Sequence, residues 1–177
     1  TRRINVHTPE GYAGSSTRYP VLYMPDGGVA EDFPHVVNTL DSLVKAGEAR
    51  PFIVVGIENT ERRRDMTGPT TMGTDSAIAP RVGGSAAFRR FIREELMPEI
   101  EAKYRTTGET GIIGESLVGL FIMETLLTEP KLFESERVPR AFCDWMEPCL
   151  FSRIVAACSP RASMLPPHWL QFRLSSK

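Results

Sequence analysis

The chain has 177 residues and a formal net charge of −1, a length that suits one domain with a substantial buried core. Charge near zero offers no basic surface for nucleic acid, and no apolar run approaches the ~20 residues that a membrane span needs. The cysteines Cys143, Cys149 and Cys158 have no metal-ligand spacing with histidine, so we expect neither a metal nor another cofactor. The chain starts at Thr1 without an initiator Met and looks trimmed. Its compartment stays open between the cytoplasm and, after removal of a signal peptide, the periplasm or exterior.

The first half of the chain predicts two buried strands and a helix. Residues 2–7 alternate in polarity and predict an edge strand, whereas the nearly continuous apolar run 19–24 predicts a central strand covered on both faces. That run ends at Asp26-Gly27-Gly28, where the backbone can turn sharply and expose N–H groups. Residues 33–47 have apolar side chains at helical spacing and stop at a glycine, and 52–57 is the next apolar strand.

A long polar, glycine-rich segment, 58–84, follows and contains the cluster Arg62-Arg63-Arg64-Asp65. A loop of this length in a compact domain usually has a function or is mobile. Ser85 is then predicted to cap a helix with one apolar face, and Pro98 to kink or break that helix near Met97.

The stretch 110–124 is the most informative part of the chain. A short β-branched run passes through Gly114-Glu115-Ser116 into an apolar segment with helical spacing. A strand that enters a helix through Gly-x-Ser is typical of a nucleophile elbow, a turn so tight that the serine is strained and its Oγ exposed. Val118 stands where the motif usually has a second glycine and is expected to crowd the junction. An ordinary serine N-cap on a core helix is the alternative.

Alternating strands and helices predict an α/β fold, with a mostly parallel sheet and helices on both faces. In such sheets the site lies beyond the carboxyl ends of the strands. Three segments are therefore expected to converge there although they are far apart in sequence: the Asp26–Gly28 turn, the loop from Asn59 to Asp65, and Ser116.

With these residues in hand, the sequence resembles the putative esterase family of α/β-hydrolases, the group that contains enterochelin-type serine esterases. The resemblance covers about residues 1–133 and rests on several stretches in the right order, among them 19–28, 57–67 and 114–117. It implies an α/β-hydrolase-type fold and the cleavage of small-molecule carboxylic esters through an acyl-enzyme on Ser116.

The resemblance also implies an oxyanion hole made of two backbone N–H groups. One belongs to Leu117, directly after the nucleophile, and the other to Gly28, with Gly27 as the fallback. One such donor is typically worth about 3 kcal/mol of transition-state stabilisation.

In this family the loop that holds Asn59, Arg64 and Asp65 shapes the acyl-binding cleft, so these three residues are the candidate substrate contacts. The alternative is that Arg64 and Asp65 merely pair with each other to order a long loop. Both interpretations remain open at this point.

A serine nucleophile needs a histidine base and an orienting carboxylate, which follow the serine along the chain in α/β-hydrolases. His168 is the only histidine after Ser116, and it follows too closely to leave room for the remaining strands and helices. It is a candidate base, with an ordinary tail residue as the alternative. The candidate acids are Glu129, Glu134, Glu136, Asp144 and Glu147. We expect the acid and the base to be missing, which makes the activity of this particular chain doubtful.

The pattern changes near residue 134, where arginine, proline, serine and cysteine become frequent. We interpret 1–133 as the α/β-hydrolase core and 134–177 as an aberrant C-terminal segment, truncated relative to the family. The hypothesis is a reading-frame shift within this segment. The codons of Trp145-Met146-Glu147-Pro148, when read one nucleotide later, encode residues similar to the sequence pattern of the family. The nucleotide sequence decides it.

Two rival functions share the predicted fold. One is a non-catalytic binding or structural homologue that keeps the cleft, and the other is an acyltransferase or peptidase, since a fold does not determine a function. The expected partner is a small-molecule ester and not a nucleic acid. The identity of the ester and homo-oligomerisation are left open.

Overall fold

The computed structural model describes residues 2–71, 73 and 81–133. Its sheet has the strand order β1-β3-β2-β4. Strands β3 and β4 run parallel to β2, and β1 pairs antiparallel with β3. The predicted edge strand and the predicted mostly parallel sheet are both confirmed. The strand bounds are β1 Ile4–His7, β2 Tyr19–Pro25, β3 Ile53–Ile57 and β4 Thr106–Ile112.

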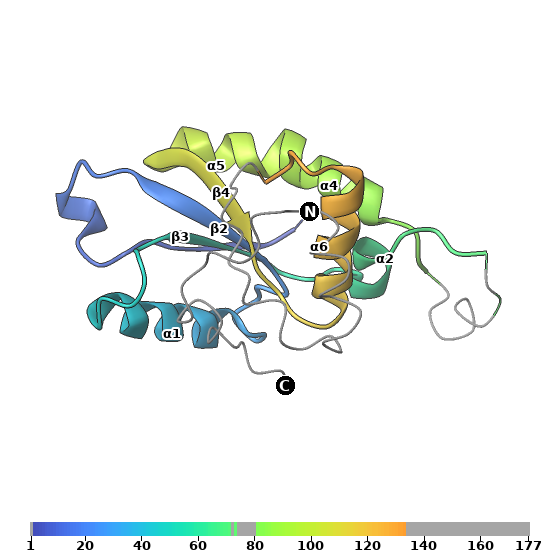
Figure 1. Cartoon of the computed structure of the whole chain (residues 1–177), viewed down its shortest axis with the longest axis horizontal. Coiled ribbons are helices and arrows are strands. Elements are labelled where there is room, and N and C mark those ends of the chain that lie inside the picture. The colour runs from blue at the N-terminus through green and yellow to red at the C-terminus, as the bar shows by residue number, and fades with distance from the viewer. Residues whose placement is uncertain (1, 72, 74–80, 134–177) are drawn as a thin grey trace, which may run out of the picture.

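Helices cover both faces of the sheet (Figure 1). On one face lies α1 (Phe33–Lys45); on the other lie α6 (Leu117–Thr128) and a helical run made of α4 (Ser85–Phe91), η2 (Ile92–Leu96) and α5 (Met97–Lys103). Two short helices, η1 (Tyr12–Gly14) and α2 (Arg62–Met66), lie in loops. This is the layered α/β architecture predicted from the sequence.

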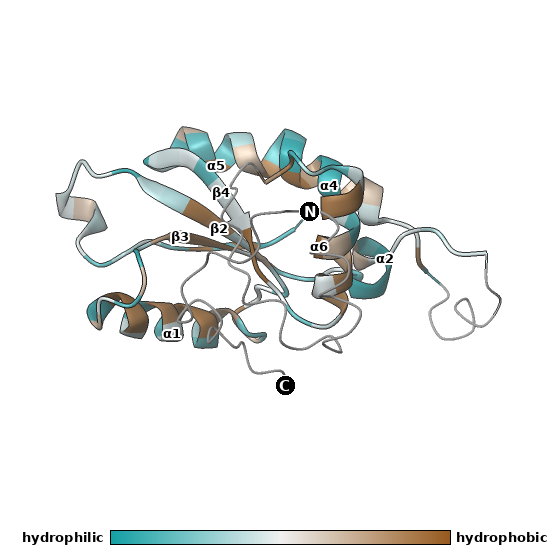
Figure 2. Ribbon diagram, viewed as in Figure 1, coloured by the Kyte–Doolittle hydropathy of each residue, from teal (hydrophilic) through white to brown (hydrophobic). Residues whose placement is uncertain are grey.

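The strands are apolar throughout because their two faces enter two different cores. Leu22 and Val54 pack with the apolar side of α1, whereas Tyr23 and Val55 pack with α4, η2, α5 and α6. Successive residues of a strand point to opposite faces, so a strand covered on both sides needs an unbroken apolar run. Figure 2 shows the matching pattern on α1, which is hydrophobic toward the sheet and hydrophilic away from it.

The helix predicted after residue 84 changes its winding where Pro98 interrupts it. The turn η2 is π-helical, and the Met97 N–H donates to the Ile92 carbonyl, five residues back. Proline has no N–H and its ring clashes with the preceding turn, so a wider turn lets the helix continue with Pro98 in the first turn of α5. The predicted interruption near Met97 is therefore a π-turn within a continuous helical run.

The prediction that Ser85 is the N-cap is wrong by one residue. Gly84 holds the cap position, and Ser85 is the first residue of α4. The Ser85 hydroxyl donates instead to Glu124 Oε1 at 2.8 Å, on the neighbouring helix α6. The Ser85 hydroxyl therefore bonds to a neighbouring helix and does not cap the N-terminus of its own helix.

Helix α6 consists mostly of apolar residues and is largely hydrophobic on the side that Figure 2 shows, yet three of its leucines, Leu120, Leu126 and Leu127, are exposed. A helix of this kind is normally buried all round.

Within the described residues, none of the helices combines the length and the apolar character needed to cross a membrane. The predicted segment 134–177, including His168, lies outside the described residues.

Candidate active site

The three predicted segments meet at one edge of the sheet. Because β2, β3 and β4 are parallel, their carboxyl ends lie at the same edge. The loop after β3 reaches the turn after β2: Asn59 Nδ2 donates to Asp26 Oδ1 at 2.5 Å, and Arg62 Nε donates to the two Asp26 oxygens at 2.8 and 2.9 Å. The charge of Glu115, next to Ser116, is near enough to Arg62 to add to the rise of its pKa.

Ser116 lies at the junction of β4 and α6 with a strained backbone, φ 54° and ψ −119°. Asp26 is the only other described non-glycine residue with positive φ, a conformation that costs about 1–3 kcal/mol for such residues. The Ser116 side chain is exposed. Within the described part of the chain it makes no capping hydrogen bond to α6. This geometry differs from an ordinary N-cap, whose backbone is extended and whose hydroxyl accepts from the helix.

The two glycines predicted as oxyanion donors are differently engaged. The Gly27 N–H donates to the Ile57 carbonyl at 3.0 Å and so extends the pairing between β2 and β3. The Gly28 N–H donates to a side chain, Glu31 Oε2, at 2.6 Å. Leu117 is the first residue of α6, where the N–H groups of a helix have no acceptor within the helix. Of the two glycines, Gly28 has the N–H that a side-chain movement would free.

The turn after β2 is held by a charged network that could not be predicted from the sequence. Arg62 Nη2 also lies 2.7 Å from Asp26 Oδ2, so the ion pair is bidentate. The hydrogen bond to Asp26 raises the pKa of Arg62, burial partly offsets it, and the charges of Glu31 and Glu115 add to the rise. The cluster 62–65 was noted in the sequence, but no local signal separates Arg62 from its arginine neighbours.

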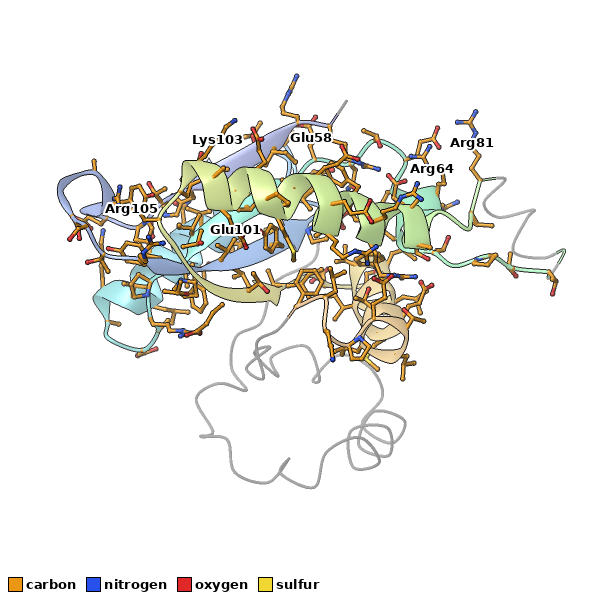
Figure 3. The ribbon with its side chains drawn as sticks, turned by 90° about the horizontal axis from the view of Figure 1, so that it is seen from above. Glu58, Arg64, Arg81, Glu101, Lys103 and Arg105 are labelled. Carbon is orange, nitrogen blue, oxygen red and sulfur yellow. The ribbon has the colours of Figure 1, made fainter. Side chains whose placement is uncertain are left out.

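Asp65 is buried, with 3% of its surface exposed. Its Oδ2 accepts from Arg2 Nη2 at 2.7 Å, and its Oδ1 accepts from Arg64 Nε and Nη2 at 2.9 and 2.7 Å. Burial by itself raises the pKa of Asp65, but the hydrogen bonds from Arg2 and Arg64 outweigh it and hold the pKa below its ordinary value. Arg64 and Arg81 both pair with Glu61 and lie at the same end of the molecule (Figure 3). These contacts match the loop-ordering alternative; substrate contacts by Arg64 and Asp65 stay a prediction.

The described residues contain two histidines. His7 Nε2 lies 3.0 Å from Asp41 Oδ1, and His7 pairs with Val54 near the start of β3, at the end of the sheet opposite Ser116. His35 is exposed in the first turn of α1. His168 lies outside the described residues, so its assignment as the base is still a prediction.

The fold is that of the α/β-hydrolases. The chain matches an IroE-like serine hydrolase from Shewanella oneidensis with a TM-score of 0.67 and 37% identity, over 75% of this chain and 43% of that one. It matches the siderophore hydrolase EstA from Aspergillus nidulans with a TM-score of 0.63 and 26% identity, over 75% and 50%.

The sequence matches the family described as "Putative esterase" over residues 1–143, so the chain belongs to that family. The ferri-bacillibactin esterase BesA of Bacillus subtilis (strain 168) is 31% identical over 166 residues, which are 82% of this chain and 54% of the relative. The resemblance drawn from the sequence is thus confirmed. The chain spans about half the length of these relatives.

Proposed function

We propose that the protein is an esterase that cleaves small-molecule carboxylic esters, with Ser116 as its nucleophile. The observation that carries the proposal is an exposed serine at φ 54° in a strand-to-helix turn. Strain at a non-glycine residue persists only where the surrounding structure enforces it, and such strain clusters at functional sites. The turn after β2, which would supply an oxyanion donor, lies at the same edge of the sheet.

In the proposed reaction Ser116 Oγ bonds to the ester carbon, the carbonyl electron pair moves to oxygen, and the hydroxyl proton passes to a base. The N–H groups of Leu117 and Gly28 would stabilise the oxyanion. Collapse expels the alcohol with a proton and leaves an acyl-enzyme, which water hydrolyses. His168 is the candidate base. If the base is missing, turnover falls to the residual ~10³–10⁴-fold over water that survives loss of a triad member.

The names of the relatives suggest which ester to test first. BesA is a ferri-bacillibactin esterase, and EstA is a siderophore hydrolase. We extend that substrate class, an ester-linked siderophore, to this chain. Asn59, Arg64 and Asp65 are the proposed cleft residues on the loop after β3.

The test compares the wild-type chain with Ser116→Ala on a short-chain nitrophenyl ester, on an ester-linked siderophore, and with an alkyl fluorophosphonate. We expect hydrolysis and covalent labelling that the alanine variant abolishes. Equal hydrolysis rates in the two proteins would refute Ser116 as the nucleophile. Added acyl acceptors that divert the acyl group from water would identify an acyltransferase.

One observation favours the non-catalytic alternative. The N–H groups of Gly27 and Gly28 are both hydrogen-bonded within the protein, so neither is free for an oxyanion as the structure stands. An unlabelled Ser116 in folded protein, with retained binding of a siderophore, would identify such a binding homologue.

A further inference from the structure

The backbone N–H of Gly28 is hydrogen-bonded to a carboxylate side chain of the same protein. Its N–H donates to Glu31 Oε2 at 2.6 Å, a short bond of the kind formed between a donor and an ionised acceptor. The same N–H is the donor that the proposed mechanism offers to the oxyanion of the substrate. A carboxylate oxygen and a tetrahedral oxyanion both carry negative charge, so they compete for one N–H.

We propose that the Glu31 carboxylate is an internal competitor of the substrate. In the free protein it occupies the hydrogen-bond position of the oxyanion, and it must leave Gly28 before Ser116 can be acylated efficiently. This inference rests on the proposed function. It makes Glu31 a residue that sets the accessibility of the oxyanion hole.

The backbone turn does not depend on this side-chain contact. The Glu31 N–H donates to the Gly28 carbonyl at 3.0 Å, which closes the turn through main-chain atoms alone. Gly27 is anchored separately to Ile57. Rotation of the Glu31 side chain therefore frees the Gly28 N–H while both backbone hydrogen bonds remain.

The Glu31 carboxylate has a second hydrogen-bond partner besides Gly28. Its Oε1 accepts from Asn59 Nδ2 at 2.8 Å, and its charge is among those that act on Arg62. A movement that takes Oε2 off Gly28 while Oε1 stays on Asn59 would not leave the carboxylate unpaired, which would keep the cost of the movement low.

Position 28 is open enough for this contact only because it has no side chain. A Cβ on Gly28 would lie 2.7 Å from Glu31 Oε2. The nearest obstructing atom is the end of a flexible side chain, and Glu58 Cγ at 3.1 Å must also give way slightly. Gly28→Ala is therefore expected to push the Glu31 carboxylate away while it keeps the backbone N–H. Gly28 does not have positive φ, and alanine can adopt its conformation. Two different substitutions thus test the same contact.

The experiment measures the second-order rate of Ser116 labelling by an alkyl fluorophosphonate in the full chain. The Oγ–P bond forms as the P–F bond breaks, and fluoride and the hydroxyl proton leave to water. We expect Glu31→Ala to label about tenfold faster than wild type, the worth of one charge-assisted hydrogen bond. Glu31→Gln should give a smaller increase, and Gly28→Ala should also accelerate labelling.

Glu58→Gln is the matched control. Glu58 borders the same turn, since a Cβ on Gly28 would lie 3.1 Å from its Cγ, but its carboxylate pairs with Arg3 at 3.6 Å. Its neutralisation removes one negative charge near the site without freeing the Gly28 N–H. Labelling of Glu58→Gln at the wild-type rate is expected. An increase equal to that of Glu31→Ala would show that the faster labelling comes from the loss of any negative charge near the site, and it would overturn the proposal.

Thermal unfolding of each variant separates loss of fold from loss of contact. Folded Glu31→Ala and Gly28→Ala proteins that label at the wild-type rate or more slowly would overturn the inference and leave the proposed function intact. A merely structural Glu31 predicts slower labelling, never faster. If Glu31→Ala does not fold, the rates of Glu31→Gln and Gly28→Ala decide. No labelling in wild type and in every variant refutes Ser116 as the nucleophile, and the inference fails with it.

Discussion

Gly114 and Val118 fit together only because position 114 has no side chain. A Cβ on Gly114 would lie 2.7 Å from the Val118 Cβ and closer still to Cγ1. Val118 is fully buried at the position where the nucleophile-elbow motif usually has a second glycine, and the sequence indicated crowding at this point. The junction holds a branched residue because the space comes from the glycine four positions earlier.

This packing predicts strong coupling between the two positions. We expect Gly114→Ala to destabilise the fold by about 1–3 kcal/mol, the usual cost of overpacking. Val118→Ala in the Gly114→Ala background should recover much of that loss, because the obstructing methyl groups are gone. Urea unfolding of both single variants and the double variant measures the coupling free energy. Additive effects would show that the two side-chain positions relax independently.

The buried ion pairs of Asp65 predict a stability that depends on pH. Because the folded pKa is below the unfolded one, the stabilisation is complete above the unfolded pKa and is lost as pH falls through the folded pKa. We expect Asp65→Asn to lower the free energy of unfolding by roughly 3 kcal/mol near neutral pH, since Arg2 and Arg64 lose their partner. The difference from wild type should shrink below about pH 4. Urea unfolding between pH 3 and 7 measures it.

Glu99→Gln is the control for that acid dependence. Glu99 pairs with Lys103, a residue of α5 labelled in Figure 3, and both side chains are more than half exposed. Such surface pairs contribute little to stability. An Asp65→Asn protein with the same stability profile as Glu99→Gln would contradict the structural role of Asp65.

The ion pair between Arg62 and Asp26 is expected to hold the turn after β2 in the conformation that reaction at Ser116 needs. Arg62→Gln removes the bidentate partner of Asp26, whose backbone has a φ of 60°. We expect fluorophosphonate labelling of Ser116 to fall at least tenfold, with near-native thermal unfolding. Arg62→Lys should recover only part of the rate, because an ammonium does not reproduce the planar fork of the guanidinium. Arg63→Gln, at an exposed position of the same helix, is the control, and an equal loss there would point to net charge alone.

The exposed leucines of α6 predict self-association. Leu127 is 66% exposed and Leu120 is 54% exposed. Leu127→Lys is expected to reduce light scattering at high protein concentration and leave thermal unfolding nearly unchanged, since an exposed side chain loses little on replacement. Marked destabilisation would reveal that this face of α6 is covered in solution.

The buried strands were predictable because each is a short and nearly continuous run of apolar residues. The runs 19–24 and 52–57 match β2 and β3 to within one residue. In contrast, β4 begins at Thr106, several residues before the apolar run, because pairing with β2 extends the strand through a polar first half. Arg18 also donates to the Thr106 carbonyl at 3.0 Å, and Arg50 pairs with Glu109 at 2.8 Å. Helix α2 has no apolar periodicity to reveal it. It is stabilised by Asp65 contacts that reach back to Arg2, 63 residues away.

The sequence alone determined the order of strands and helices and the position of Ser116 where a strand enters a helix. These follow from periodicities and small residues within a short window, and parallel strands then bring their ends to one edge. The tertiary structure alone decided how the polar atoms are paired there: Arg62, not Arg64, on Asp26, and Glu31 on the Gly28 amide. A polar side chain takes whichever partner the folded backbone places within reach. Folding brings many such partners from elsewhere in the chain, so their pairing cannot be read from local sequence.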